Sequence, residues 1–235
     1  MSAPAPYLLF NEVLKNKNTT RKCLGIAKNY FTKSLKNDPS KVVLPKYPLI
    51  FSKTLSALQP KNSPQFKLPK DSVKNQINHE VELGVMLKKG GGKGEGWKNC
   101  IGGYFLLLDY SDGLQAKNAS EKGTPWFMAK AQDGFLMLSD LIPVEAIEDP
   151  HQVELELTIN GETRQRDVTG NMHYKLWEQL DYINQYLTLG EGDILMTGTP
   201  EGLGPVNEGD KMECWMTYKG KELARIKQDI VRDTV

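Results

Sequence analysis

The chain reads His79-Glu-Val-Glu-Leu-Gly-Val-Met-Leu87 and, beyond a glycine-rich turn, Ile101-Gly-Gly-Tyr-Phe-Leu-Leu-Leu-Asp109. In the first segment, every second residue from Val81 to Leu87 is valine or leucine, and the positions between and before them are Glu80, Glu82, Gly84 and Met86. This is the period of a strand with one apolar face. The second segment is apolar or glycine up to its last residue, which is typical of a buried strand. The two segments therefore predict two strands of a sheet.

Other short apolar segments also have the pattern of strands. Asn160-Gly161 separates two of them and is a strong signal for a two-residue hairpin, and Gly220 lies inside a second expected hairpin. The further strands that we expect are Cys23–Ala27, a buried strand Leu49–Ser52, Val153–Asn160, Glu162–Arg166, Ile194–Met196, Lys211–Tyr218 and Lys221–Ile226.

Helical periodicity is rare in the chain. One segment has it, with apolar residues at Leu176, Leu180, Ile183 and Leu187. Residues 31–48 and 58–70 are rich in proline and polar residues and predict loops. Many short strands with few helices predict a mixed α/β, β-rich fold rather than a doubly wound parallel sheet.

Composition excludes several classes of protein. Thirty basic and twenty-nine acidic residues in 235 give a net charge of +1, which disfavours a nucleic-acid-binding role. The longest strongly apolar run, Ile101–Leu108, is far shorter than the roughly 20 residues of a membrane-spanning helix. Cys23, Cys100 and Cys214 stand far apart, so we expect neither a disulfide framework nor a thiolate zinc site.

The length favours one domain, residues 23–235, preceded by a variable N-terminal segment, residues 1–22. Tyr7–Leu14 has the pattern of a small amphipathic helix before the basic stretch Lys15–Lys22, which would suit a mitochondrial presequence. Glu12 and the late position of the basic cluster argue against one. Mitochondrial and cytoplasmic locations both stay open.

Three acids form the candidate site. Glu80 and Glu82 are two apart on a strand, so they leave the same face about 6.5–7 Å apart. Such a pair repels unless a cation lies between the carboxylates, and oxygen ligands suit a hard ion such as Mg²⁺ or Mn²⁺. Asp109, at the end of a buried strand, would complete a set that leaves room for water and substrate. The alternative is an edge strand with a solvated acidic face.

Two further features could complete this site. Lys130 follows the apolar approach Pro125-Trp-Phe-Met-Ala, and beside three carboxylates it would stay charged. Alternatively, it extends into solvent from an edge strand. The turn Thr197-Gly-Thr-Pro200 offers hydroxyl and amide groups that could bind a carboxylate, or it is only a tight turn.

Taken together, these motifs resemble the fumarylacetoacetate hydrolase family, and within it the small acylpyruvate hydrolase and oxaloacetate decarboxylase branch. They occur in the family's order from about Cys23 to Tyr218. The resemblance implies a β-sandwich roll fold, a homodimer and bound Mg²⁺ or Mn²⁺. By position, it implies metal ligands at Glu80, Glu82 and Asp109, an active-site lysine at Lys130, and a substrate-binding Thr199.

The chain also departs from the family pattern. Active members of the branch carry Gly-Arg-Asn-Tyr-x-x-His followed three residues later by Glu, a pair that activates water. This chain has Ala27-Lys-Asn-Tyr-Phe-Thr-Lys33, with Lys36 at the glutamate position. A lysine with a pKa near 10.4 is a poor general base at pH 7. Lys28 stands where the family has arginine, and Gln115 matches a family glutamine, so both are candidate substrate contacts.

No histidine clearly replaces the missing base. His79 adjoins Glu80 but points to the opposite strand face if the alternation holds, which indicates a structural histidine or one that supports the site from behind. His151 and His173 lie in expected loops, away from every motif.

Two functional hypotheses follow. The first is divalent-metal-dependent cleavage of a C–C bond in a small 2-oxo acid, by acylpyruvate hydrolysis or oxaloacetate decarboxylation. The metal would stabilise the enolate, Lys130 would help to hold its charge, and decarboxylation would need no activated water. The second is a catalytically silent family member that serves as a binding or structural subunit of a larger assembly, for example a mitochondrial one.

Overall fold

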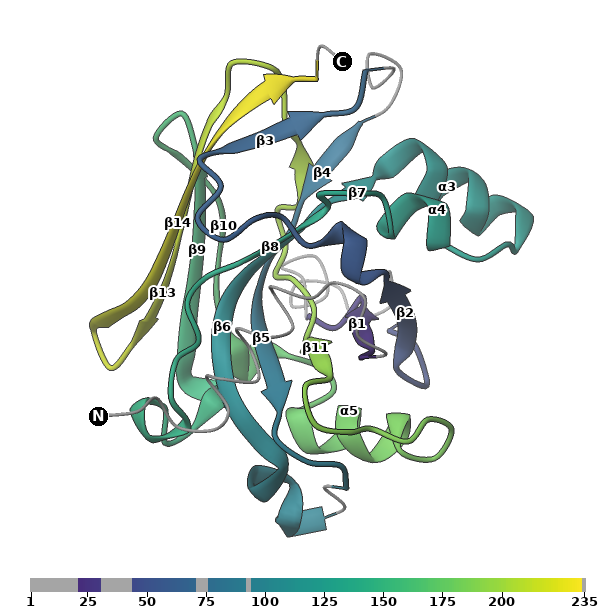
Figure 1. Cartoon of the computed structure of the whole chain (residues 1–235), viewed down its shortest axis with the longest axis vertical. Helices are drawn as coiled ribbons and strands as arrows, with labels where there is room; N and C mark the ends of the chain where they lie inside the picture. Colours follow the sequence, from purple (N-terminus) through teal and green to yellow (C-terminus); the bar gives the residue numbers. More distant parts are fainter. Residues whose placement is uncertain (1–20, 31–43, 71–75, 92–93, 234–235) are drawn as a thin grey trace.

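The computed structural model describes residues 21–30, 44–70, 76–91 and 94–233, whose course is drawn in Figure 1. One sheet has six strands in the order β2-β1-β11-β5-β6-β8. Its strands are β1 (Cys23–Ala27), β2 (Leu49–Lys53), β5 (Val81–Leu87), β6 (Ile101–Asp109), β8 (Leu136–Leu138) and β11 (Ile194–Met196).

A second sheet has five strands in the order β10-β9-β13-β14-β3, and a third, small sheet has the order β12-β4-β7. The strands of the second sheet are β3 (Gln65–Leu68), β9 (Val153–Ile159), β10 (Glu162–Val168), β13 (Lys211–Tyr218) and β14 (Lys221–Arg232). Those of the third are β4 (Ile77–His79), β7 (Ser111–Asp112) and β12 (Gly204–Pro205).

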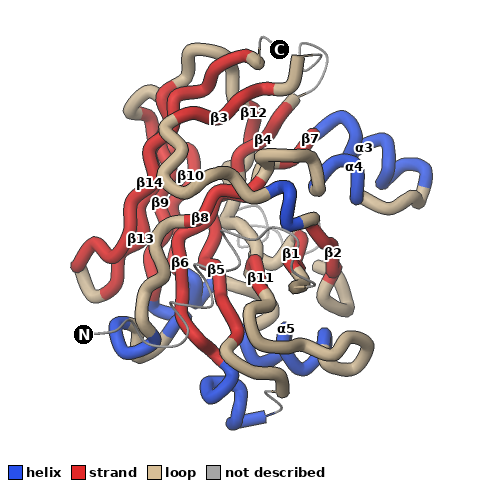
Figure 2. The backbone as a smooth tube through the Cα atoms, viewed as in Figure 1, coloured by secondary structure: helices blue, strands red, loops and turns tan. Residues whose placement is uncertain are grey.

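The described α-helices lie around the sheets (Figure 2). They are α3 (Gly113–Lys122), α4 (Phe127–Lys130) and α5 (Leu176–Ile183). Short 3₁₀ turns are η1 (Leu55–Ala57), η3 (Gly94–Cys100), η4 (Val144–Ala146), η5 (Pro150–Gln152) and η6 (Thr169–Asn171). The expected β-rich mixed fold is therefore confirmed.

The strands β5 and β6 separate two apolar cores. They pair antiparallel, and every residue of both strands is buried. On one face, Val81 and Leu83 pack in a core that includes residues of β9, β13 and β14. On the other face, Met86 and Phe105 belong to a smaller core that includes Phe51 of β2. The sequence pattern indicated one apolar face, but both faces are covered.

Several local expectations hold, and three need correction. Asn160 and Gly161 have φ angles of 54° and 81°, as a two-residue hairpin turn requires. The strand at residues 49–52 is an edge strand rather than a buried one, because Leu49 and Ile50 are exposed and only Phe51 packs in a core. Residues 58–70 include β3, which pairs with the C-terminal strand. The helix near residue 180 ends at Ile183, so Leu187 lies outside it.

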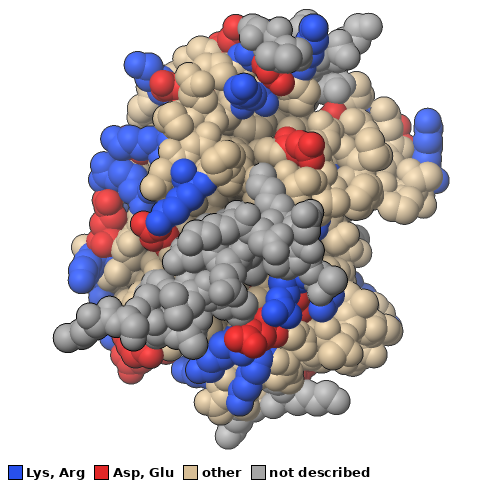
Figure 3. Space-filling model, in the orientation of Figure 1, with Lys and Arg blue, Asp and Glu red and all other residues tan. Residues whose placement is uncertain are grey.

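Surface charge and cysteine chemistry agree with the composition. Basic and acidic side chains are interspersed on the face drawn in Figure 3. All three cysteines are free and buried, so no disulfide joins them. Among the described residues, none of the helices has the length and apolarity needed to cross a membrane. Residues 1–22 fall almost wholly outside the described part of the chain, as do Lys33 and Lys36.

The close contact between Gly84 and Phe105 gives a test of the packing at the β5–β6 pair. A Cβ atom at Gly84 would lie 2.1 Å from Phe105 Cε2 and 2.8 Å from Leu107 Cδ2. We therefore expect Gly84→Ala to lower the free energy of unfolding by about 1–3 kcal/mol, measured in urea. Gly190→Ala is the control, because nothing lies within 4 Å of its added Cβ. Equal stabilities of the two variants would contradict the packing described here.

Candidate metal and substrate site

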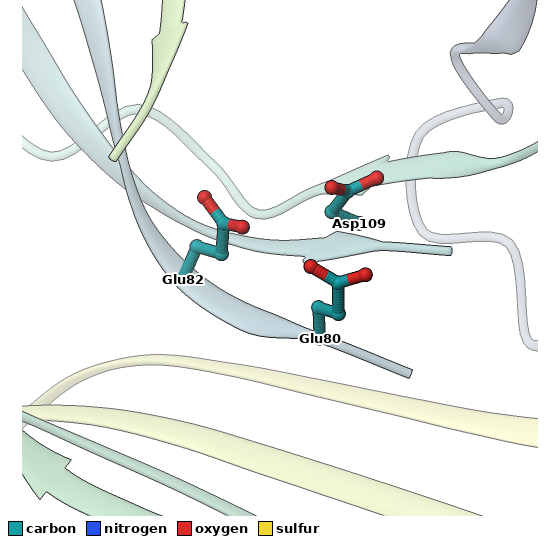
Figure 4. A group of neighbouring side chains, drawn as sticks. All are labelled: Glu80, Glu82 and Asp109. Atoms are coloured by element: carbon teal, nitrogen blue, oxygen red, sulfur yellow. The ribbon is translucent and has the colours of Figure 1, made fainter. Parts of the chain in front are cut away.

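Three carboxylates converge at the point where β5 begins and β6 ends (Figure 4). Glu80 lies between β4 and β5, Glu82 lies on β5, and Asp109 is the last residue of β6. Glu82 pairs with Leu107, two residues before Asp109, so both acids extend from the face that carries the smaller core. Each of the three acids offers an oxygen, and these oxygens lie within 4.8 Å of one another.

The cluster is buried rather than solvated. The side chains of Asp109 and Glu82 are almost fully inaccessible, and that of Glu80 is 13% exposed. Burial and the charges of Asp109 and Glu80 raise the pKa of Glu82 well above its ordinary value, although the Gly198 amide donates to Glu82 Oε2 over 2.7 Å. The alternative of an exposed acidic strand face is therefore wrong.

Lys130 neutralises part of this charge. It is the last residue of α4, it is buried, and its Nζ lies 2.7 Å from Glu80 Oε1 and 2.6 Å from Asp109 Oδ2. Burial alone would lower its pKa, but the charges and hydrogen bonds of Asp109 and Glu80 outweigh burial and raise it. Lys130 is thus a buried ammonium inside the cluster and does not extend into solvent from an edge strand.

A second lysine, Lys53, was missed by the sequence analysis. Its side chain is fully buried, and its Nζ lies 2.7 Å from Asp109 Oδ1. The ammonium also donates to the carbonyl oxygens of Tyr110, Lys130 and Phe135. Burial lowers the pKa of Lys53, and the negative charge of Asp109, which acts to raise it, offsets only part of this effect. The sequence held one indication of this position: Lys53 is two residues after Phe51, so in a strand both side chains lie on the same face, here the inner face of β2.

The donor set fits a hard divalent cation. Three carbonyls accept from Lys53, and its ammonium also lies 2.7 Å from Asp109 Oδ1. This buried oxygen has no other partner among the described residues, so a lone pair is left for a cation. With all five groups ionised, three carboxylates and two ammonium groups carry one net negative charge. Carboxylate oxygens are the ligands that Mg²⁺ and Mn²⁺ prefer. Glu80, Glu82 and Asp109 could therefore hold such an ion.

A cavity of about 390 Å³ opens beside the cluster. Its walls include Glu80, Lys130, Thr199 and Lys28, so the fold brings four of the predicted site residues to one space. Glu82 and Asp109 lie behind these residues and do not line the cavity. Gln115 is not among the lining residues, and its amide donates to Asp112 Oδ2 over 3.0 Å.

The turn after β11 is held tightly against the cluster. The Thr199 hydroxyl donates to the Val81 carbonyl and accepts from Gln165 Nε2, both over 2.8 Å. Gly198 has a φ of 101°, and a Cβ there would lie 2.7 Å from Asn29 Cβ. The amide of Gly198 and the hydroxyl of Thr199 thus bind groups of the protein itself. A contact between Thr199 and substrate remains a prediction.

The histidines lie apart from the cavity walls. His79 is buried, and its Nδ1 lies 3.0 Å from Gln165 Oε1, which also accepts from the Val81 amide. Because Gln165 in turn donates to Thr199, His79 supports the turn from behind, as the strand alternation indicated. His151 bonds to Asp149 and contacts the Trp97 and Trp177 rings. None of the three histidines is among the described residues that line the cavity.

The cavity also borders a buried tyrosine with an unused hydroxyl. Tyr30 lies in its wall, and the Tyr30 hydroxyl is buried without a hydrogen-bond partner. Its neighbour Asn29 is bonded through its side chain to the Thr197 and Tyr174 carbonyls and to the Tyr174 amide. These bonds fix the chain at residues 29–30 against the turn that carries Thr199.

Comparison with known proteins gives a consistent set of relatives. Residues 22–231 match the family model described as fumarylacetoacetate (FAA) hydrolase, C-terminal. The chain is 37% identical over 192 residues to a mitochondrial oxaloacetate tautomerase of Arabidopsis thaliana, covering 80% of this chain and 82% of that protein. It is 32% identical over 203 residues to a mitochondrial oxaloacetate decarboxylase of Dictyostelium discoideum, covering 85% and 90%.

Solved structures agree with these relatives. Fumarylpyruvate hydrolase of Pseudomonas aeruginosa, in complex with Mn²⁺ and pyruvate, superposes with a TM-score of 0.78 at 26% identity, covering 91% of this chain and 90% of that one. A fumarylacetoacetate hydrolase family protein of Yersinia pestis superposes with a TM-score of 0.77 at 30% identity, covering 91% and 93%.

Removal of Lys53 tests the charge balance of the cluster. Lys53→Met removes one of the two buried ammonium partners of Asp109, so we expect the free energy of unfolding to fall by about 3–5 kcal/mol. Lys61→Met is the control, because Lys61 pairs with Asp140 on the surface, where such pairs contribute about 1 kcal/mol or less. Urea denaturation at pH 7 measures both. A loss as small as that of the control would show that Lys53 does not balance the cluster.

The environment of His79 predicts a pH dependence of stability. Burial lowers the pKa of His79 from 6.5 to about 4. The folded state therefore favours neutral His79, and its contribution to stability is complete above pH 6.5 and is lost as the pH falls towards 4. We expect wild type to lose about 3 kcal/mol more than His79→Gln between pH 7 and pH 4, by urea denaturation. Parallel stability curves for the two proteins would contradict the buried neutral imidazole.

Proposed function

Because this chain belongs to the fumarylacetoacetate hydrolase family, we propose that it binds Mg²⁺ or Mn²⁺ through Glu80, Glu82 and Asp109 and forms the enolate of a small 2-oxo acid. Enolate formation is shared by tautomerisation and decarboxylation of oxaloacetate. The observation that carries the proposal is the buried cluster of three carboxylates and two lysines beside an open cavity. The relatives named for oxaloacetate chemistry, and the Mn²⁺–pyruvate complex, support it.

The residues of the chain have separable roles in this proposal. When bound, the cation would act as a Lewis acid that stabilises negative charge on the keto oxygen. Lys130 uses two N–H groups on Glu80 and Asp109, so its third can donate to a substrate oxygen in the cavity. Lys53 contacts Asp109 from the opposite side and holds its carboxylate in place. Lys28, Thr199 and Gln115 remain predicted substrate contacts, of which Gln115 lies off the cavity wall.

Two reactions match these roles without an activated water. In tautomerisation, a proton leaves C3 and the C2 oxygen gains one. In decarboxylation, the C3–C4 bond breaks, its electron pair passes to the enolate, CO₂ leaves, and C3 later takes up a proton. Hydrolysis of an acylpyruvate would also need a base for water, and the described residues of the cavity wall include no histidine. We therefore place hydrolysis behind the two oxaloacetate reactions.

The remaining proposals concern location and assembly. Because several relatives are named as mitochondrial, we favour mitochondria over the cytoplasm. A homodimer stays a proposal from the family resemblance. The alternative of a silent binding or structural subunit has less support, because the relatives of known name are named as enzymes.

Metal binding gives the direct test. We expect calorimetry to detect uptake of one Mn²⁺ per chain by wild type and none by Glu82→Gln, whereas the surface variant Glu154→Gln binds as wild type does. With metal present, wild type should accelerate the ultraviolet-monitored loss of enol-oxaloacetate, and chelation should return the rate to that of the buffer. Lys130→Met should bind metal but lower kcat by about 10²–10³-fold.

These arms separate the hypotheses. Metal uptake without acceleration of either oxaloacetate reaction would support the silent subunit. No uptake by wild type would exclude the proposed ligand set.

A further inference from the structure

The cavity beside the cluster has two unlike parts. One end is polar, formed by Glu80, Lys130, Ser111 and Thr199, where the proposed function places the 2-oxo acid group. The remaining wall is largely apolar and is built from segments far apart in the sequence. Its main members are Ile26, Tyr30, Leu44, Ala116, Trp126 and Leu203.

The cavity is larger than an oxaloacetate molecule needs. A water molecule occupies about 30 Å³ of the liquid, so 390 Å³ corresponds to roughly 13 water-sized groups. Oxaloacetate has four carbons and five oxygens. Even at the loose packing of a liquid, space for roughly four further carbon atoms would remain beside the apolar wall.

The charges on the wall do not favour a second carboxylate in this apolar part. Apart from Lys130, the cations among the described residues of the wall are Lys28 and Lys117, and both are exposed. Glu201 adds a negative charge to the same wall. The Lys117 ammonium already has an anionic neighbour on α3, because its Nζ lies 3.9 Å from Glu121 Oε1. A carboxylate buried against leucine, isoleucine and tryptophan would lose hydration without a buried partner among the described residues.

We propose that the preferred substrate is a 2-oxo acid with an apolar chain or ring beyond C3, which packs against Ile26, Ala116 and Leu203, rather than a short dicarboxylate. The proposal rests on the enolate chemistry proposed above and specifies its substrate class. The acid group binds at the polar end, and the apolar tail fills the space that oxaloacetate leaves open. Burial of each added methylene then contributes to transition-state binding.

A homologous series of substrates tests this inference with the unmodified protein. Enolate formation exchanges C3 hydrogens for deuterium, which proton NMR follows in D₂O with Mg²⁺ for pyruvate, 2-oxobutanoate, 2-oxohexanoate and 2-oxo-octanoate. We expect kcat/KM to rise about fourfold per methylene until the cavity is full. Oxaloacetate, whose reaction is monitored as the loss of its enol form, serves as the dicarboxylate reference. Its kcat/KM should be lower than that of the longest acid that still fits the cavity.

A cavity-filling variant gives an independent measure. Ala116→Leu should lower the ratio of kcat/KM for 2-oxohexanoate to that for pyruvate by about tenfold, because the added side chain occupies the space of the tail. Asn118→Leu is the matched control, since residue 118 is exposed on the same helix and does not line the cavity. Its ratio should equal that of wild type. If Ala116→Leu does not fold, the substrate series alone still decides.

The outcomes separate this inference from the function on which it rests. If none of the acids, oxaloacetate included, reacts although metal is bound, the proposed function itself is contradicted. Exchange that is present but flat or falling with chain length would overturn only the inference. So would a preference for oxaloacetate that Lys28→Met or Lys117→Met abolishes, because the cavity would then recognise a second carboxylate.

Discussion

The organisation of this protein depends on the burial of three carboxylates at one point. Glu80, Glu82 and Asp109 are held together by the β5–β6 pair, and their mutual repulsion in a dry environment is large. Two lysines offset it, and each comes from a different element. Lys53 reaches Asp109 from the edge strand β2, and Lys130 reaches it from the short helix α4. The electrostatic balance of one cluster thereby constrains how four elements pack.

The same balance suits the chemistry proposed for this site. Glu82 and Asp109 lie on paired strands and Glu80 directly precedes β5, so little reorganisation is needed when a ligand binds. One oxygen of Asp109 is left without a hydrogen bond, and Lys130 donates two of its three N–H groups, to Glu80 and Asp109, which leaves the third for a ligand. Gln165 links the buried His79 to Thr199 behind the site, so the turn that closes the cavity has its own support.

Many of the strands could be predicted from residue patterns, because these patterns depend only on neighbouring residues. Alternation identified β5 and β9, the apolar run identified β6, and Asn160-Gly161 identified a hairpin. Errors arose where burial depends on distant segments. Residues 49–52 were expected to be buried because they are apolar, yet β2 forms the edge of its sheet. Residues 65–68 resemble a loop, and they become a strand only because β14 lies beside them.

For the site, the sequence by itself determined which acids lie on one face, because a period of two leaves no other choice for Glu80 and Glu82. Their meeting with Asp109, and the burial of all three, was decided by the tertiary structure, which covers a face that could equally have been solvated. The role of Lys53 was also decided there. A lysine in a strand looks the same in sequence whether it reaches water or, as here, a buried carboxylate, since its partners lie more than fifty residues away.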